Sequence, residues 1–112
     1  MKAQSETRDG VLFFSFSGSL DSLTVAEAEQ SAKSWLLDKP MKLAGNLQDL
    51  DYISSAGLRL IMMMAKQVRT DGGEICLYNL QDTVKEVFEI AGFHQFVPLA
   101  EDETDALKKL GT

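Results

Sequence analysis

The sequence predicts an α/β protein in which helices pack against a layered sheet. Short runs of aromatic and β-branched residues alternate along the chain with longer segments of helical periodicity. Helices that connect successive strands favour parallel pairing in the middle of the sheet. No internal repeat or low-complexity segment interrupts this alternation. A layered α/β architecture is therefore expected.

The composition is that of one globular domain and excludes several kinds of function. The 112 residues are 45% hydrophobic and 25% charged, and the net charge is −6. With only Cys76 and His94 of their types, the chain lacks an intramolecular disulfide and the usual zinc ligands, so no metal or other cofactor is expected. The negative charge disfavours nucleic acid and anionic membranes as partners. No signal peptide or membrane-spanning segment is recognised, so a cytoplasmic location is expected.

The N-terminal part is expected to form two strands and a helix. Residues 11–17 predict a strand that ends at Gly18, and residues 4–9 are the candidate for its edge partner. Thr24 and Glu27 have the spacing of a capping box, in which each side chain bonds the backbone amide of the other residue. The apolar stripe of the helix that follows is Val25, Ala28, Ala32, Trp35 and Leu36, before a stop at Pro40.

The middle of the chain predicts a buried strand followed by the longest helix. Residues 41–47 are mostly apolar and form the strand, in which Gly45 is the weak point. Residues 48–54 are interpreted as a connection from this strand to a helix over residues 56–70. The apolar stripe of that helix is predicted to be Leu58, Ile61, Met62, Ala65 and Val68.

The C-terminal part repeats the alternation on a smaller scale. Residues 74–78 predict a strand, and Cys76 within it is expected to be a small buried apolar side chain. Thr83 is expected to cap the next helix. Residues 96–99 predict a short last strand, and residues 102–110 a short helix with its acids first and its lysines last, as the helix dipole favours.

Two serines lie where the longest helix begins. At such a position the first amides lack partners, and a serine hydroxyl is among the preferred caps. The same amides and the positive end of the helix dipole also accommodate a phosphate group. The residues by themselves therefore allow Ser54 or Ser55 to be a plain helix cap or a phosphate acceptor. Gly57 is interpreted as keeping the nearby surface open to a partner.

Ordered motifs along nearly the whole chain indicate a family. They are Gly18-Ser19-Leu20-Asp21 with Thr24, Asn46-Leu47-Gln48-Asp49-Leu50, Tyr52-Ile53-Ser54-Ser55-Ala56-Gly57-Leu58, Gly72-Gly73, Thr83-Val84-Lys85-Glu86-Val87-Phe88 and Ala91-Gly92-Phe93. In this order they resemble the bacterial anti-sigma factor antagonists of the STAS family. The resemblance implies that residues 1–112 form one STAS domain, with a mixed sheet of about four to five strands and about four helices packed mainly on one face.

The resemblance also implies a function. The family's phosphorylated serine aligns with Ser55, while Ser54 replaces the family's acidic residue and is the alternative acceptor. The unphosphorylated protein is expected to bind an anti-sigma factor that is itself a serine kinase and carries the ATP, and so to release the sigma factor. Phosphorylation ends the complex, and a PP2C-type phosphatase restores the binding form. No catalytic residue is implied; the implied partner-binding residues are Asp21, Ser54, Ala56, Gly57, Leu58 and Arg59.

Other interpretations remain open at this point. A related STAS module without phosphorylation could serve a lipid-transport, scaffold or secretion-regulating complex. An enzyme such as a nucleotide hydrolase is disfavoured, because the chain has no phosphate-binding glycine loop and no evident nucleophile–base pair. Asp21, Asp49 and Asp51 form a candidate carboxylate cluster, although turns and caps explain Asp49 and Asp51 nearly as well. Met62-Met63-Met64 chiefly indicates core filling, with Met63 or Met64 as a candidate for partner contact.

Overall fold

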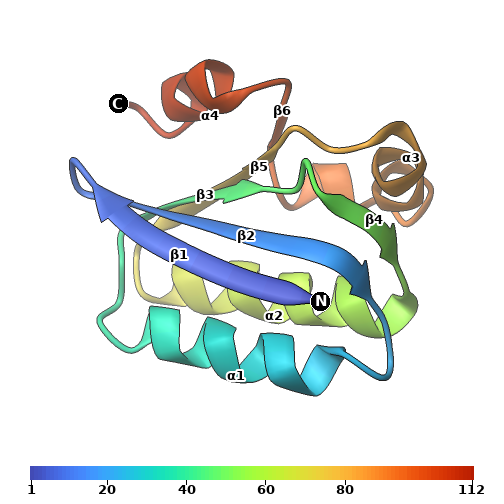
Figure 1. The fold of residues 1–112 in the computed structure, drawn as a ribbon. Helices are drawn as coiled ribbons and strands as arrows, with labels where there is room; N and C mark the ends of the chain where they lie inside the picture. The colour runs from blue at the N-terminus through green and yellow to red at the C-terminus, as the bar shows by residue number, and fades with distance from the viewer.

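The computed structural model describes all 112 residues and is built around a six-stranded mixed sheet (Figure 1). The strands are β1 (Lys2–Arg8), β2 (Val11–Leu20), β3 (Lys42–Asn46), β4 (Leu50–Ile53), β5 (Glu74–Tyr78) and β6 (Leu99–Ala100). Their order is β1-β2-β3-β5-β6, and β4 pairs with the second half of β2. Only β1 runs antiparallel to its neighbour. The predicted α/β class is confirmed, and the sheet has more strands than the four to five expected.

The helices cover the two faces of the sheet unequally. They are α1 (Val25–Leu36), α2 (Ser55–Thr70), α3 (Asp82–Ile90) and α4 (Glu103–Lys109), with a 3-10 turn η1 (Phe93–Gln95) after α3. Figure 1 shows α1 and α2 side by side under the sheet, α3 beside β4, and α4 on the opposite face. The expected arrangement, with helices mainly on one face, is confirmed. None of these helices has the length and apolar character needed to cross a membrane.

Strand β2 is buried on both faces and joins two cores. Its residues Phe14 and Phe16 point into the larger core, where their ring centroids lie 5.4 and 5.5 Å from that of Trp35 on α1. On the other face, Phe13 belongs to a smaller core under α4 that also contains Cys76. The expectation that Cys76 is a buried apolar side chain is confirmed. This alternation follows from the two-residue period of a strand.

Strand β4 was not expected, because residues 48–54 were interpreted as a connection. Its position depends on Gly18, which has φ +88° and donates its amide to the carbonyl of Asp49 at 2.8 Å. The register between β2 and β4 shifts at this glycine. The step from Gly18 to Ser19 opposes the two steps from Leu50 to Tyr52, so the extra residue, Asp51, lies on β4. Strand β2 continues through Gly18, and the prediction that this glycine ends the strand was wrong. Strand β2 pairs with β3 as far as Ser15 and with β4 from Gly18 to Leu20.

The capping bonds predicted for Thr24 and Thr83 are absent. Thr24 is the N-cap of α1, but its side chain makes no capping bond within the helix. Thr83 lies inside α3, whose N-cap is Gln81. The Thr24 hydroxyl instead accepts the amide of Asp21 and donates to the carbonyl of Ser19. The last strand is shorter than predicted and begins at Leu99.

The buried stripe of α2 is rotated relative to the prediction. Leu58 and Met62 are only half-buried, whereas Leu60 and Met64 are buried. Residues 60–65 are all apolar, so periodicity alone cannot identify which of them face the core. The expectation of core filling by methionine holds for Met64.

We expect Gly45→Ala to destabilise the protein. A Cβ at this position in β3 would overlap the ring of Phe14 and lie 2.7 Å from Cδ2 of Leu77. Overpacking of this kind costs about 1–3 kcal/mol of the free energy of unfolding. Urea unfolding followed by Trp35 fluorescence measures the loss. Ser34→Ala, on the exposed surface of α1, is the matched control and should change stability little. A Gly45→Ala protein as stable as this control would contradict the packing argument.

Candidate functional site

The two serines at the start of α2 have different structural roles. Ser54 is the N-cap, with its Oγ accepting the amide of Gly57 at 3.4 Å and its carbonyl accepting the amide of Leu58 at 2.9 Å. Ser55 is the first residue of the helix and is exposed, and its hydroxyl makes no hydrogen bond within the protein. The capping role therefore belongs to Ser54, and the Ser55 hydroxyl is left available.

The start of α2 is attached to the end of β2. The amide of Ser54 donates to the carbonyl of Leu20 at 2.9 Å. Gly57 is buried against the same carbonyl, and a Cβ on it would lie 2.8 Å from that oxygen and 2.8 Å from Cγ1 of Ile53. The interpretation that Gly57 opens the surface to a partner was wrong, because its missing side chain lets the helix approach the strand. This contact holds the neighbouring Ser55 at a defined place.

Asp21 organises the loop beside Ser55. Its Oδ1 accepts the amides of Leu23 and Thr24 at 2.9 and 3.1 Å, and its own amide donates to the Thr24 hydroxyl at 3.0 Å. This is a reciprocal capping box one turn earlier than the one predicted from Thr24 and Glu27. The amides bond only Oδ1, so the second carboxylate oxygen stays without a partner in the protein. Because the carbonyl of Leu20, just before this loop, accepts the amide of Ser54, the loop lies beside the start of α2.

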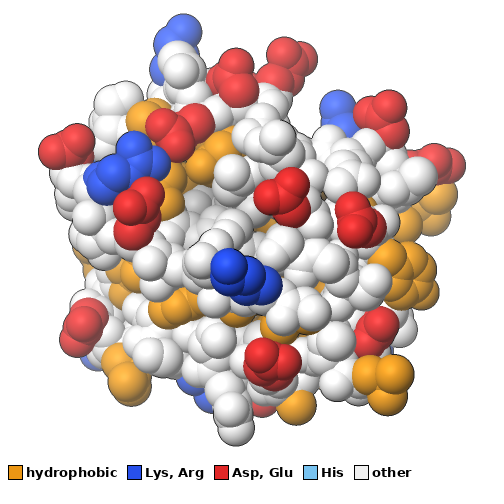
Figure 2. Space-filling model, in the orientation of Figure 1, with side chains coloured by type: hydrophobic (Ala, Val, Ile, Leu, Met, Phe, Trp, Pro, Cys, Tyr) orange, Lys and Arg blue, Asp and Glu red, His pale blue; other side chains and the backbone are white.

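Two exposed apolar side chains near Ser55 were not identified from the sequence. Leu23, in the loop after β2, is 91% exposed, and Tyr52, on β4, is 54% exposed. Figure 2 shows hydrophobic side chains along the side of the molecule where β4, α3 and the β2–α1 loop lie. Leu23 falls outside any periodic stripe, and Tyr52 lies on a strand that the sequence did not reveal. Both lie on segments that meet at the start of α2, because the carbonyl of Leu20 accepts the amide of Ser54 and β4 leads directly into the helix.

The remaining predicted contact residues lie on the first turns of α2. Ala56 and Leu58 are half-buried, whereas Arg59 is exposed and forms no ion pair. Arg59 follows Ser55 by four residues, so the two share one face of the helix. The structure thus brings Asp21, Ser55 and Arg59 to one side of the molecule.

The aspartates do not form a carboxylate cluster. Asp51 accepts a hydrogen bond at 3.0 Å from Nε2 of Gln81, which also donates to the carbonyl of Gln48 at 2.8 Å. The carbonyl of Asp49 accepts the amide of Gly18. No group of three His, Cys, Asp or Glu side chains lies close enough to hold a metal ion. Gln81, which sequence reasoning missed, therefore ties the start of α3 to the β3–β4 connection and to β4, the strand that leads to Ser54.

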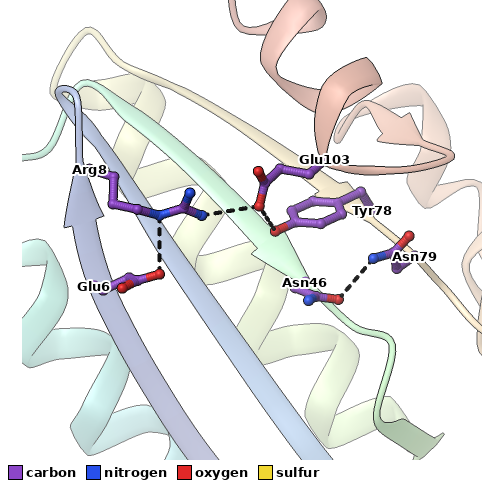
Figure 3. Close-up of polar contacts among 6 residues, drawn as sticks. All are labelled: Glu6, Arg8, Asn46, Tyr78, Asn79 and Glu103. Carbon is purple, nitrogen blue, oxygen red and sulfur yellow. Dashed lines mark hydrogen bonds and ion pairs between the residues drawn. The ribbon is translucent and has the colours of Figure 1, made fainter.

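A polar hollow of about 410 Å³ lies on the opposite face of the sheet. Figure 3 shows the Arg8 guanidinium between Glu6 and Glu103, at N–O distances of 3.1 and 3.0 Å. Arg8 also lies 3.9 Å above the Phe13 ring. The Tyr78 hydroxyl donates a hydrogen bond to Glu103 at 3.4 Å. Burial, and to a smaller extent the carboxylate of Glu103, raises the pKa of Tyr78 to about 12. These side chains satisfy one another and link β1 to α4, which favours a structural role.

Comparison with known proteins identifies the family. The STAS domain model matches residues 2–106, so the chain belongs to the STAS domain family. A Bordetella bronchiseptica protein named as the anti-sigma factor antagonist BtrV is 37% identical over 100 residues, which cover 89% of this chain and 86% of BtrV.

Solved structures share the fold. An anti-sigma factor antagonist from Mycobacterium paratuberculosis superposes with a TM-score of 0.90 at 22% identity, covering 99% of this chain and 94% of its own. The anti-sigma factor antagonist SpoIIAA gives a TM-score of 0.80 in its unphosphorylated form, at 20% identity over 98% of this chain and 96% of its own. Its phosphorylated Bacillus form gives 0.72 at 19% identity, over 96% of this chain and 98% of its own.

We expect Ser54→Ala to reduce stability and Ser55→Ala to leave it unchanged. Loss of a serine cap costs about 0.5–2 kcal/mol, and the long 3.4 Å bond places Ser54 at the lower end of that range. Urea unfolding of the two variants beside the unmodified protein measures the difference. Equal losses in both variants would show that Ser55 also caps the helix.

Proposed function

We propose that this chain is an anti-sigma factor antagonist that binds an anti-sigma factor through the surface around Ser55. We define this switch surface by Asp21, Leu23, Tyr52, Ser55 and Arg59. The observation that carries the proposal is an exposed serine hydroxyl without a hydrogen bond in the protein, with two exposed apolar side chains on the segments that meet at the same helix start. The BtrV relative and the SpoIIAA fold, both bearing the name of antagonists, support it.

The chemistry of the switch surface suits reversible protein binding. Removing a side chain such as Leu23 from water contributes about 1.5–3 kcal/mol, and tyrosines such as Tyr52 are frequent anchors of interfaces. Asp21 and Arg59 add one charge of each sign, which would orient a partner more than increase its affinity. The hydrogen bonds and close packing behind Ser55 reduce the entropy that binding would cost.

We further propose that the anti-sigma factor is a serine kinase and transfers phosphate from its own ATP to Ser55. The first turn of α2 has free amides and the positive end of the helix dipole, so the fold tolerates a phosphate there. Because Ser54 supplies the cap, modification of Ser55 removes no bond of the protein. Within an interface, the added charge of about −2 meets desolvation and the carboxylate of Asp21, which would dissociate the complex.

The cycle closes when a PP2C-type phosphatase removes the phosphate and restores binding. In this proposal residues 1–112 act as one STAS binding module in the cytoplasm, with no catalytic role of their own. The phosphorylated form of SpoIIAA supports the idea that this fold accommodates a phosphoryl group. Ser54 is the less suitable acceptor, because its hydroxyl already accepts the amide of Gly57.

We expect the cognate anti-sigma kinase and ATP to incorporate one phosphate per chain, at Ser55. Intact-mass analysis measures incorporation, and peptide mapping locates it. Ser55→Ala should abolish it, whereas Ser54→Ala should retain it, since only the Ser55 hydroxyl is unbonded. Incorporation that persists in Ser55→Ala would assign the switch to another residue.

We expect Ser55→Asp to weaken the binding of this protein to the anti-sigma factor by about tenfold or more, which corresponds to about 1.4 kcal/mol. Ser55→Asn is the matched control, because it has nearly the same shape without the charge. Titration calorimetry with the anti-sigma factor compares the two. If the Ser55→Asp and Ser55→Asn variants bind equally well, a negative charge at position 55 is not the switch. A STAS module without phosphorylation then becomes the better explanation.

A further inference from the structure

The exposed face of α2 carries cations and methionines in an otherwise acidic protein. The charged side chains of α2 are Arg59, Lys66 and Arg69, all of them positive, although the whole chain has a net charge of −6. None of the three forms an ion pair within the protein. Between Arg59 and Lys66, the half-buried Met62 and Met63 line a shallow hollow of about 470 Å³.

This hollow lies on the same helical face as the Ser55 hydroxyl. Its lining residues are Arg59, Met62, Met63, Lys66, Gln67 and Thr70. With 3.6 residues per turn, positions 55, 59, 66 and 70 fall on one line along the helix, opposite the buried side chains. From Ser55 to Thr70 this line extends about 22 Å at 1.5 Å per residue. We name the part from Arg59 to Thr70 the basic methionine face.

We propose that the basic methionine face docks an acidic amphipathic segment of the anti-sigma partner, as a second contact that continues from the switch surface. This inference rests on the proposed function, because that partner must bring its ATP to the Ser55 hydroxyl. A protein that covers the first turn of α2 is already aligned with the rest of the same helical face. The docking contact lies beyond the phosphate position on the same helix.

The chemistry of the face specifies its occupant. Unpaired cations on a helix surface attract carboxylates, and flexible methionines adapt to apolar side chains of different shapes. A segment with acids one helical turn apart and aliphatic residues between them matches both features. The acidic character of the rest of the chain opposes a lipid surface as the occupant, since anionic lipids would be repelled around the helix.

The test compares two charge reversals of equal size. Lys66→Glu changes the basic methionine face, and Lys108→Glu changes an exposed lysine on α4, on the opposite side of the sheet. Binding of the cognate anti-sigma kinase is measured by titration calorimetry at low and moderate salt. Lys66→Glu should lower affinity about tenfold and reduce its salt dependence, while Lys108→Glu should change affinity less than twofold. Phosphate incorporation at Ser55 under saturating kinase should remain.

A second measurement does not need the kinase. A synthetic amphipathic helical peptide with glutamates one turn apart and leucines between them is titrated into labelled protein, and methyl NMR spectra are recorded. Shifts should concentrate at Met62 and Met63 and disappear in Lys66→Glu. The same peptide with glutamine in place of glutamate should bind at least tenfold more weakly.

The outcomes separate this inference from the proposed function. If the kinase binds but Lys66→Glu behaves like Lys108→Glu, the docking contact is wrong and the proposed function stands. If the kinase does not bind at all, the proposed function fails, and the peptide result decides the docking chemistry. A dimer that Lys66→Glu dissolves, or binding to anionic vesicles that it abolishes, would overturn the inference in favour of a second copy or a lipid surface.

Discussion

The carbonyl oxygen of Leu20 makes the contacts on which the arrangement of this protein most depends. It accepts the amide of Ser54 at the start of α2, and Gly57 packs against the same oxygen without room for a side chain. The end of β2, the loop held by Asp21 and the first turn of α2 therefore meet at one point. Because β4 pairs with the same end of β2, Tyr52 is fixed beside them.

At this junction the serine that stabilises the helix start differs from the serine proposed as the switch. Ser54 supplies the cap, so Ser55 carries no bond whose loss would weaken the helix. In the proposed cycle, a phosphate on Ser55 therefore changes the surface and its charge while the core stays as it is. In that cycle the two adjacent serines would divide tasks that a single residue could not perform together, since a capping hydroxyl is occupied and a modified one no longer caps in the same way.

The charge distribution follows the same layout. Acidic residues dominate the chain, and the ions of the polar hollow on the far face are paired within the protein. The cations of α2 are left unpaired along the face that begins at Ser55. A negative group added at the head of this face would be attracted by Arg59 and repelled by Asp21. The paired ions thus lie on the face covered by α4, and the unpaired cations lie on α2, on the other face.

The sequence by itself determined the α/β class, the order of the main elements and Ser55 as the candidate switch, because periodicity and family motifs are properties of the chain. The tertiary structure decided which serine caps α2, that β2 continues past Gly18 to pair with β4, and that Gly57 is needed for close packing. It also placed Leu23 and Tyr52 beside Ser55 and tied Gln81 to Asp51. These features depend on contacts between residues distant in sequence, which local patterns do not encode.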